Sequence, residues 1–93
     1  MKTHTFTIYA DPGHAWCKVH FKKLFDLGIH NKISHYSYMR GLYAYLEEDC
    51  DLSLLIHAIQ SKGDTVAFNE KHTNKTSKIR GYSRYNLTLQ GIA

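Results

Sequence analysis

An apolar stripe with helical spacing is the strongest structural signal in this sequence. Its members recur at i, i+3, i+4 and i+7 and are Leu52, Leu55, Ile56 and Ile59. That spacing places side chains along one face of an α-helix. Asp49 or Asp51 precedes the stripe as an N-cap, and Gly63 follows it as a helix terminator. The stripe therefore predicts an amphipathic helix.

Segments on both sides of this helix alternate between apolar and polar residues, as half-buried strands do. They are residues 3–10, two runs within 33–46 that meet in a hairpin at Arg40-Gly41, and residues 64–70. A further helical pattern runs from about Cys17 to Leu27, although Trp16 to Val19 also suits extended chain. The order β-α-β-β-α-β predicts an α+β fold. Specifically, it predicts a ferredoxin-like antiparallel sheet with two helices on one face and a C-terminal extension.

The stretch Asp11-Pro12-Gly13-His14 predicts a type II turn after the first strand. Proline fixes φ at about −65°, and glycine accepts the positive φ that follows. In a ferredoxin-like sheet the first and third strands are adjacent and parallel, so the loops at their C-terminal ends share one edge. We therefore expect Asp11 and His14 to lie near the acidic residues 47–51.

Length and composition predict one folded domain. The chain has 93 residues, of which 43% are hydrophobic and 13% aromatic, and this composition excludes a disordered chain. We expect a core over residues 1–70 and a basic extension over 71–93. No apolar run approaches the length of a transmembrane helix. Two cysteines without a signal peptide's apolar segment predict reduced thiols in the cytoplasm.

The predicted polar edge admits three interpretations. His14, Cys17 and His20, with Asp49 or Cys50, supply ligand types that zinc accepts, but their spacing matches no common metal motif. Alternatively, Cys17 or Cys50 activated by His14 would be a thiol nucleophile. The third interpretation is structural, with His14 in contact with the acidic cluster and Cys17 in the core. We favour the structural interpretation and expect neither a metal nor another cofactor.

The sheet face that the helices leave uncovered is a second candidate surface. Tyr43 and Tyr45 alternate with apolar residues, so we expect them to point outward beside Tyr9 of the first strand. RNA-recognition domains stack unpaired bases on aromatic residues of such central strands. The RNP consensus of those domains is absent from this chain, and tyrosine favours strands in any role.

The positive charge of the chain is concentrated near its C-terminus. Residues 71–85 contain five lysine and arginine residues and no acid, so the rest of the chain has a charge of −1 although the whole carries +4. Cations interleaved with tyrosines suit nucleic acids and also protein interfaces, and the structural alternative is a solvated basic strand or short helix. The candidate partner-binding residues are Lys71, Lys75, Lys78, Arg80, Tyr82, Arg84 and Tyr85.

Four stretches together resemble a group of small proteins carried by bacteriophages and prophages. They are YADPGHAW at 9–16, ISHYSY at 33–38, YLEEDCD at 45–51 and KHTNKTSKIRGY at 71–82, and the resemblance covers roughly residues 6–85. It implies an accessory protein that acts in the host cytoplasm. Small single-domain proteins of this kind often bind host machinery, and anti-CRISPR inhibitors are similar in size and in lacking enzymatic motifs.

The leading hypothesis is therefore a non-enzymatic inhibitor of a host protein or ribonucleoprotein complex, in particular a CRISPR effector. The basic segment would contact acidic protein or guide RNA, while an acidic set would imitate phosphates and so block the handling of nucleic acid. The acidic set is Glu47, Glu48 and Asp51. One alternative is a small RNA- or single-stranded-DNA-binding domain that uses the tyrosine face and the basic segment. Another is a metal- or thiol-dependent enzyme at the His14, Cys17 and Asp49 edge. No membrane partner is expected.

Overall fold

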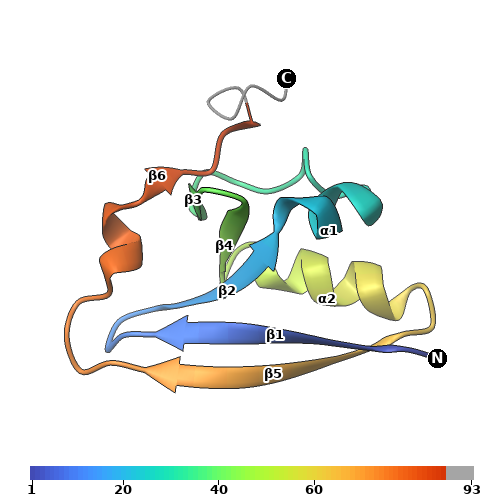
Figure 1. The fold of residues 1–93 in the computed structure, drawn as a ribbon, viewed down its shortest axis with the longest axis horizontal. Coiled ribbons are helices and arrows are strands. Elements are labelled where there is room, and N and C mark those ends of the chain that lie inside the picture. Colours follow the sequence, from blue (N-terminus) through green and yellow to red (C-terminus); the bar gives the residue numbers. More distant parts are fainter. Residues whose placement is uncertain (88–93) are drawn as a thin grey trace.

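The computed structural model describes residues 1–87 as an α+β fold with a six-stranded mixed sheet and two α-helices (Figure 1). The elements are β1 (Thr3–Ala10), β2 (Ala15–His20), α1 (Phe21–Asp26), β3 (Tyr38–Arg40), β4 (Tyr43–Glu47), α2 (Leu52–Gln60), β5 (Thr65–His72), a 3-10 helix η1 (Lys78–Gly81) and β6 (Ser83–Arg84). The α+β class expected from the sequence is confirmed. Within the described residues, neither α-helix has the length and apolar character needed to span a membrane.

The strand order differs from that of a ferredoxin-like sheet. The order is β5-β1-β2-β4-β3-β6. β1 pairs in parallel with β5 and antiparallel with β2, and β2 pairs antiparallel with β4. The expectation that the first strand lies adjacent and parallel to the third strand, around residues 43–46, is wrong, because β2 separates β1 from β4.

This additional strand is the first half of the segment predicted as a helix. β2 includes Cys17 to His20, so α1 begins only after His20. Cys17 and Val19 are buried against the helices, whereas Trp16 packs in a separate cluster on the other face. The apolar residues therefore also fit the strand period of two, and aromatic and β-branched residues favour a strand. His20 then caps α1, because its Nδ1 accepts a hydrogen bond from the Lys22 amide at 3.0 Å.

The turn between β1 and β2 is closed by a side chain. Gly13 does not have the positive φ that a type II turn requires, so the prediction of a type II turn is wrong. Instead, Asp11 Oδ1 accepts hydrogen bonds from the amides of Gly13 at 3.0 Å and His14 at 2.9 Å. The Asp11 amide in turn donates to the His14 carbonyl. This Asx-type bonding replaces the backbone conformation that the Pro-Gly pair alone would favour.

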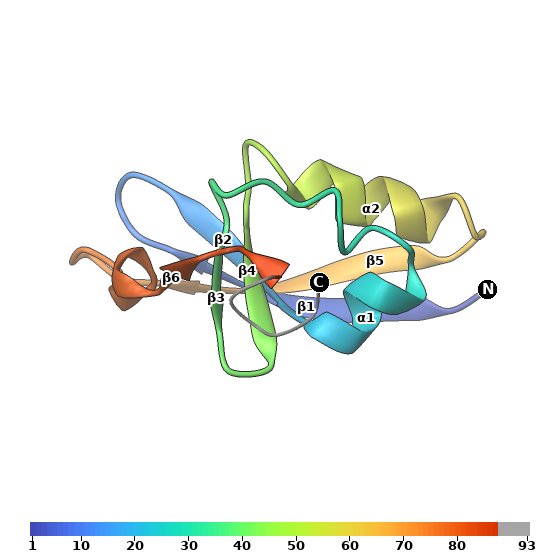
Figure 2. The same cartoon turned by 90° about the horizontal axis from the view of Figure 1, so that it is seen from above.

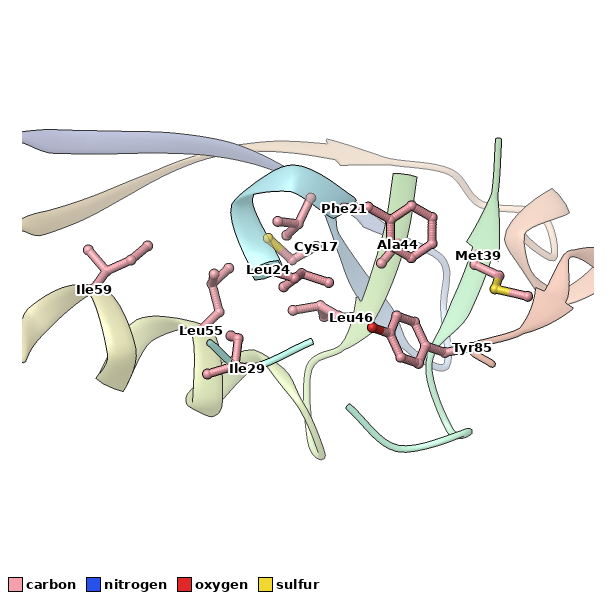
Figure 3. Close-up of a cluster of buried hydrophobic side chains, with 11 residues drawn as sticks. Cys17, Phe21, Leu24, Ile29, Met39, Ala44, Leu46, Leu55, Ile59 and Tyr85 are labelled. Carbon is pink, nitrogen blue, oxygen red and sulfur yellow. The ribbon is translucent and has the colours of Figure 1, made fainter. Parts of the chain in front are cut away.

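One hydrophobic cluster joins the sheet to both helices (Figure 3). Leu55 and Ile59, from the predicted stripe, are fully buried in it together with Leu24 of α1. Cys17 and Leu46 face them from β2 and β4. Figure 2 shows α2 lying beside β5, with which it is in contact. Full burial of one such leucine or isoleucine contributes about 1.5–3 kcal/mol, so this contact is a main source of stability for α2.

Asp51 precedes α2, but its side chain is hydrogen-bonded to the preceding loop and not to the helix. No hydrogen bond from its side chain caps the helix. The carboxylate accepts from the amide and hydroxyl of Ser34 and from the hydroxyl of Ser37. Residues 33–37, predicted as part of a strand, therefore form a loop that is tied to the start of α2. The predicted hairpin itself is confirmed, with Gly41 at a φ of 60° between β3 and β4.

The basic segment crosses the sheet and adds a strand to it. β5 ends at His72, and after η1 the strand β6 pairs with β3 at the opposite edge of the sheet (Figure 1). Ile79 of η1 is buried in the cluster on the face away from the helices, and Tyr85 is buried in the main core. The segment is thus part of the folded body. The end of the predicted extension, residues 88–93, lies outside the described residues.

Candidate functional site

The sheet face opposite the helices carries polar and aromatic side chains. Side chains alternate along a strand, so this helix-free face receives those residues of β1, β2 and β4 that do not enter the main core. They are Thr3, Thr5, Thr7, Tyr9, Trp16, Lys18, His20, Tyr43, Tyr45 and, at the end of β4, Glu47. The three tyrosines expected on this face all lie on it.

A hollow of about 350 Å³ lies over the exposed part of this face. Its lining residues are Thr5, Phe6, Thr7, Tyr9, Lys18, His20, Lys23 and Tyr43. The lining combines ammonium groups, an imidazole, hydroxyls and aromatic rings, and it contains no carboxylate. A concave surface with cations and no acids attracts anions. We call this hollow the sheet-face groove.

Tyr43 is the exposed aromatic ring of the groove. It is 37% exposed. Lys18 Nζ lies 4.3 Å from the centre of its ring, and the His20 ring meets it edge-on at 5.2 Å. Because His20 Nδ1 accepts the Lys22 amide proton, the neutral imidazole carries its own proton on Nε2 and can donate it. The ring therefore has the Lys18 ammonium over it and the His20 imidazole in edge contact with it.

Tyr45 is covered, in contrast to the expectation for base stacking. It is 8% exposed and packs against Tyr82, with ring centres 5.1 Å apart. Trp16, Tyr38 and Ile79 complete this second buried cluster. Burial, followed by the proximity of Tyr82, raises the pKa of Tyr45. The return of the basic segment across the sheet thus removes Tyr45 from the accessible face.

Two further hollows meet the sheet-face groove at Tyr9. One, of about 160 Å³, shares Tyr9 and Lys18 with the groove and adds Lys78 and Tyr82. The other, of about 370 Å³, adds three lysines and several hydroxyls. Its lysines are Lys71, Lys75 and Lys78. None of the described residues that line either hollow is acidic, so the positive surface continues from the groove into the loop after β5.

Arg80 is held by Asp11. Its Nε and Nη2 donate to the two Asp11 carboxylate oxygens at 2.7 and 2.9 Å, and the Ser77 amide donates to the same carboxylate at 2.9 Å. These hydrogen bonds, that of Arg80 first, hold the pKa of Asp11 well below its usual value of 3.8. The guanidinium also lies 5.2 Å from the Trp16 ring. Arg80 thus anchors η1 to the turn after β1, although the sequence suggests a partner contact.

Glu47 and Asp49 do lie near the turn, as expected, but through a different strand pairing, whereas the Asp51 carboxylate binds Ser34 and Ser37. β2 pairs antiparallel with β4, and Trp16 is opposite Glu47. His14 Nδ1 therefore comes within 3.6 Å of Glu47 Oε1. Both Glu47 carboxylate oxygens also accept the Asp49 amide proton at 3.2 Å. The proximity comes from the antiparallel pairing of β2 with β4 and not from two parallel strands.

The proposed ligand set of His14, Cys17 and His20 is not brought together. Residues three apart on a strand point to opposite faces, so Cys17 enters the core while His20 lies on the helix-free face. Burial raises the pKa of Cys17 to about 12, which argues against a thiolate there. Interaction with Glu47 raises the pKa of the exposed Cys50 as well.

Several candidate partner-binding residues face the interior. Glu47 is 7% exposed, Asp51 3% and Tyr85 5%. Tyr82 is half-buried against Tyr45. The exposed candidates are Lys71, Lys75, Lys78, Arg80, Arg84 and Glu48, although Arg80 is bound to Asp11. Of these, Arg84 lies 4.7 Å from the ring of Tyr38 and donates to the His35 carbonyl.

Comparison of the chain with known protein families, with curated proteins and with solved structures finds no match. The resemblance to phage and prophage proteins therefore stays a prediction.

Proposed function

We propose that this protein binds single-stranded nucleic acid in the sheet-face groove. The observation that carries the proposal is a concave surface of about 350 Å³ in which Lys18, Lys23 and an exposed tyrosine meet without any carboxylate. Small single-strand-binding domains combine a positively charged groove with aromatic rings on which bases stack. The function is therefore binding, with no reaction assigned.

The lining suggests a role for each kind of group. Tyr43 offers a ring for stacking, since it is exposed and on the same surface as the cations. Lys18 and Lys23 would contact phosphates, and His20 would donate from Nε2. Thr5 and Thr7 add hydroxyls along β1. Unpaired bases can lie flat on such a surface, whereas the bases of a duplex are already stacked on one another.

The direct test is fluorescence anisotropy with a labelled single strand of about 12 nucleotides, within the range that small binding domains cover. Tyr43→Ala should weaken binding by about 5- to 150-fold, because stacking on one aromatic ring contributes about 1–3 kcal/mol per base. Tyr36→Ala is the matched control, since Tyr36 is 63% exposed and lies in the loop before β3, outside the groove. Circular dichroism verifies that both variants are folded.

Two results would contradict the proposal. One is a Tyr43→Ala variant that binds the single strand as tightly as the parent protein. The other is equal affinity for the single strand and for a duplex of the same sequence, because a duplex does not offer its base faces to Tyr43.

The inhibitor of a host defence complex stays a prediction. Of the residues expected to carry it, Glu47 and Asp51 are buried and Arg80 is bound to Asp11. The phosphate-imitating set is thus reduced to Glu48 on the accessible surface. The sheet-face groove has more support from the geometry, and we therefore place it first.

A further inference from the structure

We propose a second, independent site: His14, Glu47 and Asp49 form a binding site for a divalent transition-metal ion of the zinc type. One ligand atom from each of these side chains lies within 4.8 Å of the others. The three residues lie at the end of the sheet where the turn after β1 meets the loop after β4. None of them lines the sheet-face groove, so this site does not depend on nucleic-acid binding.

The backbone positions of the three residues are fixed by the fold. The His14 amide is bound by Asp11 Oδ1 at 2.9 Å. Glu47 is the last residue of β4 and is opposite Trp16 of β2. The Asp49 amide turns back to the Glu47 carboxylate, at 3.2 Å from each oxygen. Two segments that are distant in the sequence are thus held together by the pairing of β2 with β4.

The carboxylate of Glu47 is buried and has no lysine or arginine partner among the described residues. The Glu47 side chain is only 10% exposed. Residues 47–51 contain four carboxylates and no lysine or arginine. Among the described residues, the Glu47 carboxylate makes an ion-pair contact with His14 alone, at 3.6 Å. Burial of a carboxylate is unfavourable unless a cation compensates its charge, and a bound metal ion would supply that charge.

The ligand chemistry favours zinc over magnesium or calcium. An imidazole nitrogen with carboxylate oxygens is a common zinc donor set, and three protein ligands leave one position open. Magnesium and calcium prefer oxygen ligands alone. Around a tetrahedral zinc ion with bonds of about 2.0–2.1 Å, ligand atoms lie roughly 3.3 Å apart. His14 and Asp49 are exposed and can rotate inward by the small remaining distance, while the buried Glu47 stays in place.

The test is isothermal titration of the metal-free protein with zinc chloride. We expect binding of one equivalent, weakened at least about tenfold in His14→Ala, since loss even of groups that only support a metal ligand lowers affinity by about 10- to 100-fold. His72→Ala is the matched control, because His72 also lies 3.6 Å from a glutamate, Glu70, but both of those side chains are more than half exposed. We expect this variant to bind zinc as the parent protein does.

Further variants distinguish this site from incidental binding by the other histidines. Glu47→Gln should also weaken zinc binding, and Asp49→Asn, at an exposed position, provides the same test if the buried substitution prevents folding. Magnesium chloride should not bind under the same conditions. The proposal is overturned if the parent protein takes up no stoichiometric zinc, if His14→Ala and His72→Ala bind it equally, or if magnesium binds as well as zinc.

Discussion

Asp11 connects parts of the chain that are far apart in sequence. Its side chain is only 1% exposed. Its carboxylate accepts hydrogen bonds from an amide of its own turn, from the Ser77 amide and from the Arg80 guanidinium. The same contact explains Gly13, because a Cβ at that position would lie 3.0 Å from Arg80 Nη2. A carboxylate with so many donors stabilises the fold only while it is ionised.

Replacement of Asp11 by asparagine should lower the thermal stability at neutral pH. Asparagine would direct an NH₂ group at the Arg80 guanidinium or at the turn amides, all of which are donors. The pKa of Asp11 is lower in the folded state than its usual 3.8, so the contribution of the carboxylate is complete above pH 3.8 and declines as the pH falls below that value. The parent protein should therefore lose more stability on acidification than Asp11→Asn.

Thermal melts of both proteins from neutral pH to below pH 3.8 provide the measurement. Lys22→Ala is the control, because it removes the exposed Lys22–Asp26 pair and should cost about 0.5 kcal/mol or less. An Asp11→Asn variant that melts with the parent protein at neutral pH would show that the ion pair does not contribute to stability.

At the level of elements, the segment after β5 packs against both faces of the sheet. η1 covers the helix-free face through Ile79. After β6, Tyr85 enters the main core, where its ring lies 5.9 Å from that of Phe21 and its hydroxyl donates to the His30 carbonyl. Burial raises the pKa of Tyr85 to about 12, so the phenol stays neutral at physiological pH. The segment is thus needed for the stability of the fold.

Tyr85→Ala should destabilise the protein by about 3–5 kcal/mol, the usual cost of removing a large aromatic ring from a core. That is a large part of the roughly 5–15 kcal/mol by which native domains are stable. Tyr85→Phe keeps the ring and should lose only about 1 kcal/mol with the hydrogen bond to His30. Urea denaturation measures both changes. The exposed Tyr36→Ala should change stability by about 0.5 kcal/mol or less, and a loss at Tyr85→Ala no larger than this would contradict the account.

For the molecule as a whole, lysines gather on one part of the surface. They line the sheet-face groove and the hollow at the loop after β5, and within residues 1–87 no acidic residue lines either of them. A positive surface of this kind attracts a polyanion. The proposed binding of a strand in the groove can therefore rely on phosphates even with few contacts to individual bases.

Single-strand binding should weaken as salt increases, with a slope of about −0.7 in log affinity against log salt for each phosphate contacted. Lys18→Ala should make this slope shallower by about 0.7 if Lys18 neutralises one phosphate. Lys32→Ala serves as the control, since Lys32 is exposed and is not among the residues that line the groove. Anisotropy titrations at several salt concentrations decide the matter, and an unchanged slope in Lys18→Ala would remove Lys18 from the phosphate contacts.

The local patterns of the sequence predict the elements better than their arrangement. The stripe of α2, the hairpin at Gly41 and the inward side chains Val66 and Phe68 of β5 all follow from periodicity and are found in the structure. β2 was the decisive exception, because Cys17 and Val19 satisfy helical and strand periods alike. Because the sequence prediction omits β2, its strand order is wrong, and it does not identify Lys18 and His20 as residues of the sheet-face groove. Alternation in AWCKVH is the signal that identifies them.

No comparable pattern in the sequence predicts the contacts between residues that are far apart in the chain. Nothing near Asp11 in the sequence indicates that Arg80 binds it, and nothing near Asp51 indicates the serines at 34 and 37. Both aspartates stand where a turn or a helix cap would use them locally, and that local role is what the sequence predicts. The fold also uses them for long-range hydrogen bonds, so that Asp51 is buried and the Arg80 guanidinium is held by Asp11.

The parallel pairing of β1 with β5 also determines when this protein can fold during synthesis. Thr3 is paired with Thr65 and Ala10 with His72, so β1 gains this neighbour only once residues 65–72 have left the ribosome. Closing so long a loop costs entropy before the pairing compensates it, and chains with such contacts fold slowly for their size. Before that, the edge of β1 that will pair with β5 is open, and an open strand edge is a site at which other strands can associate.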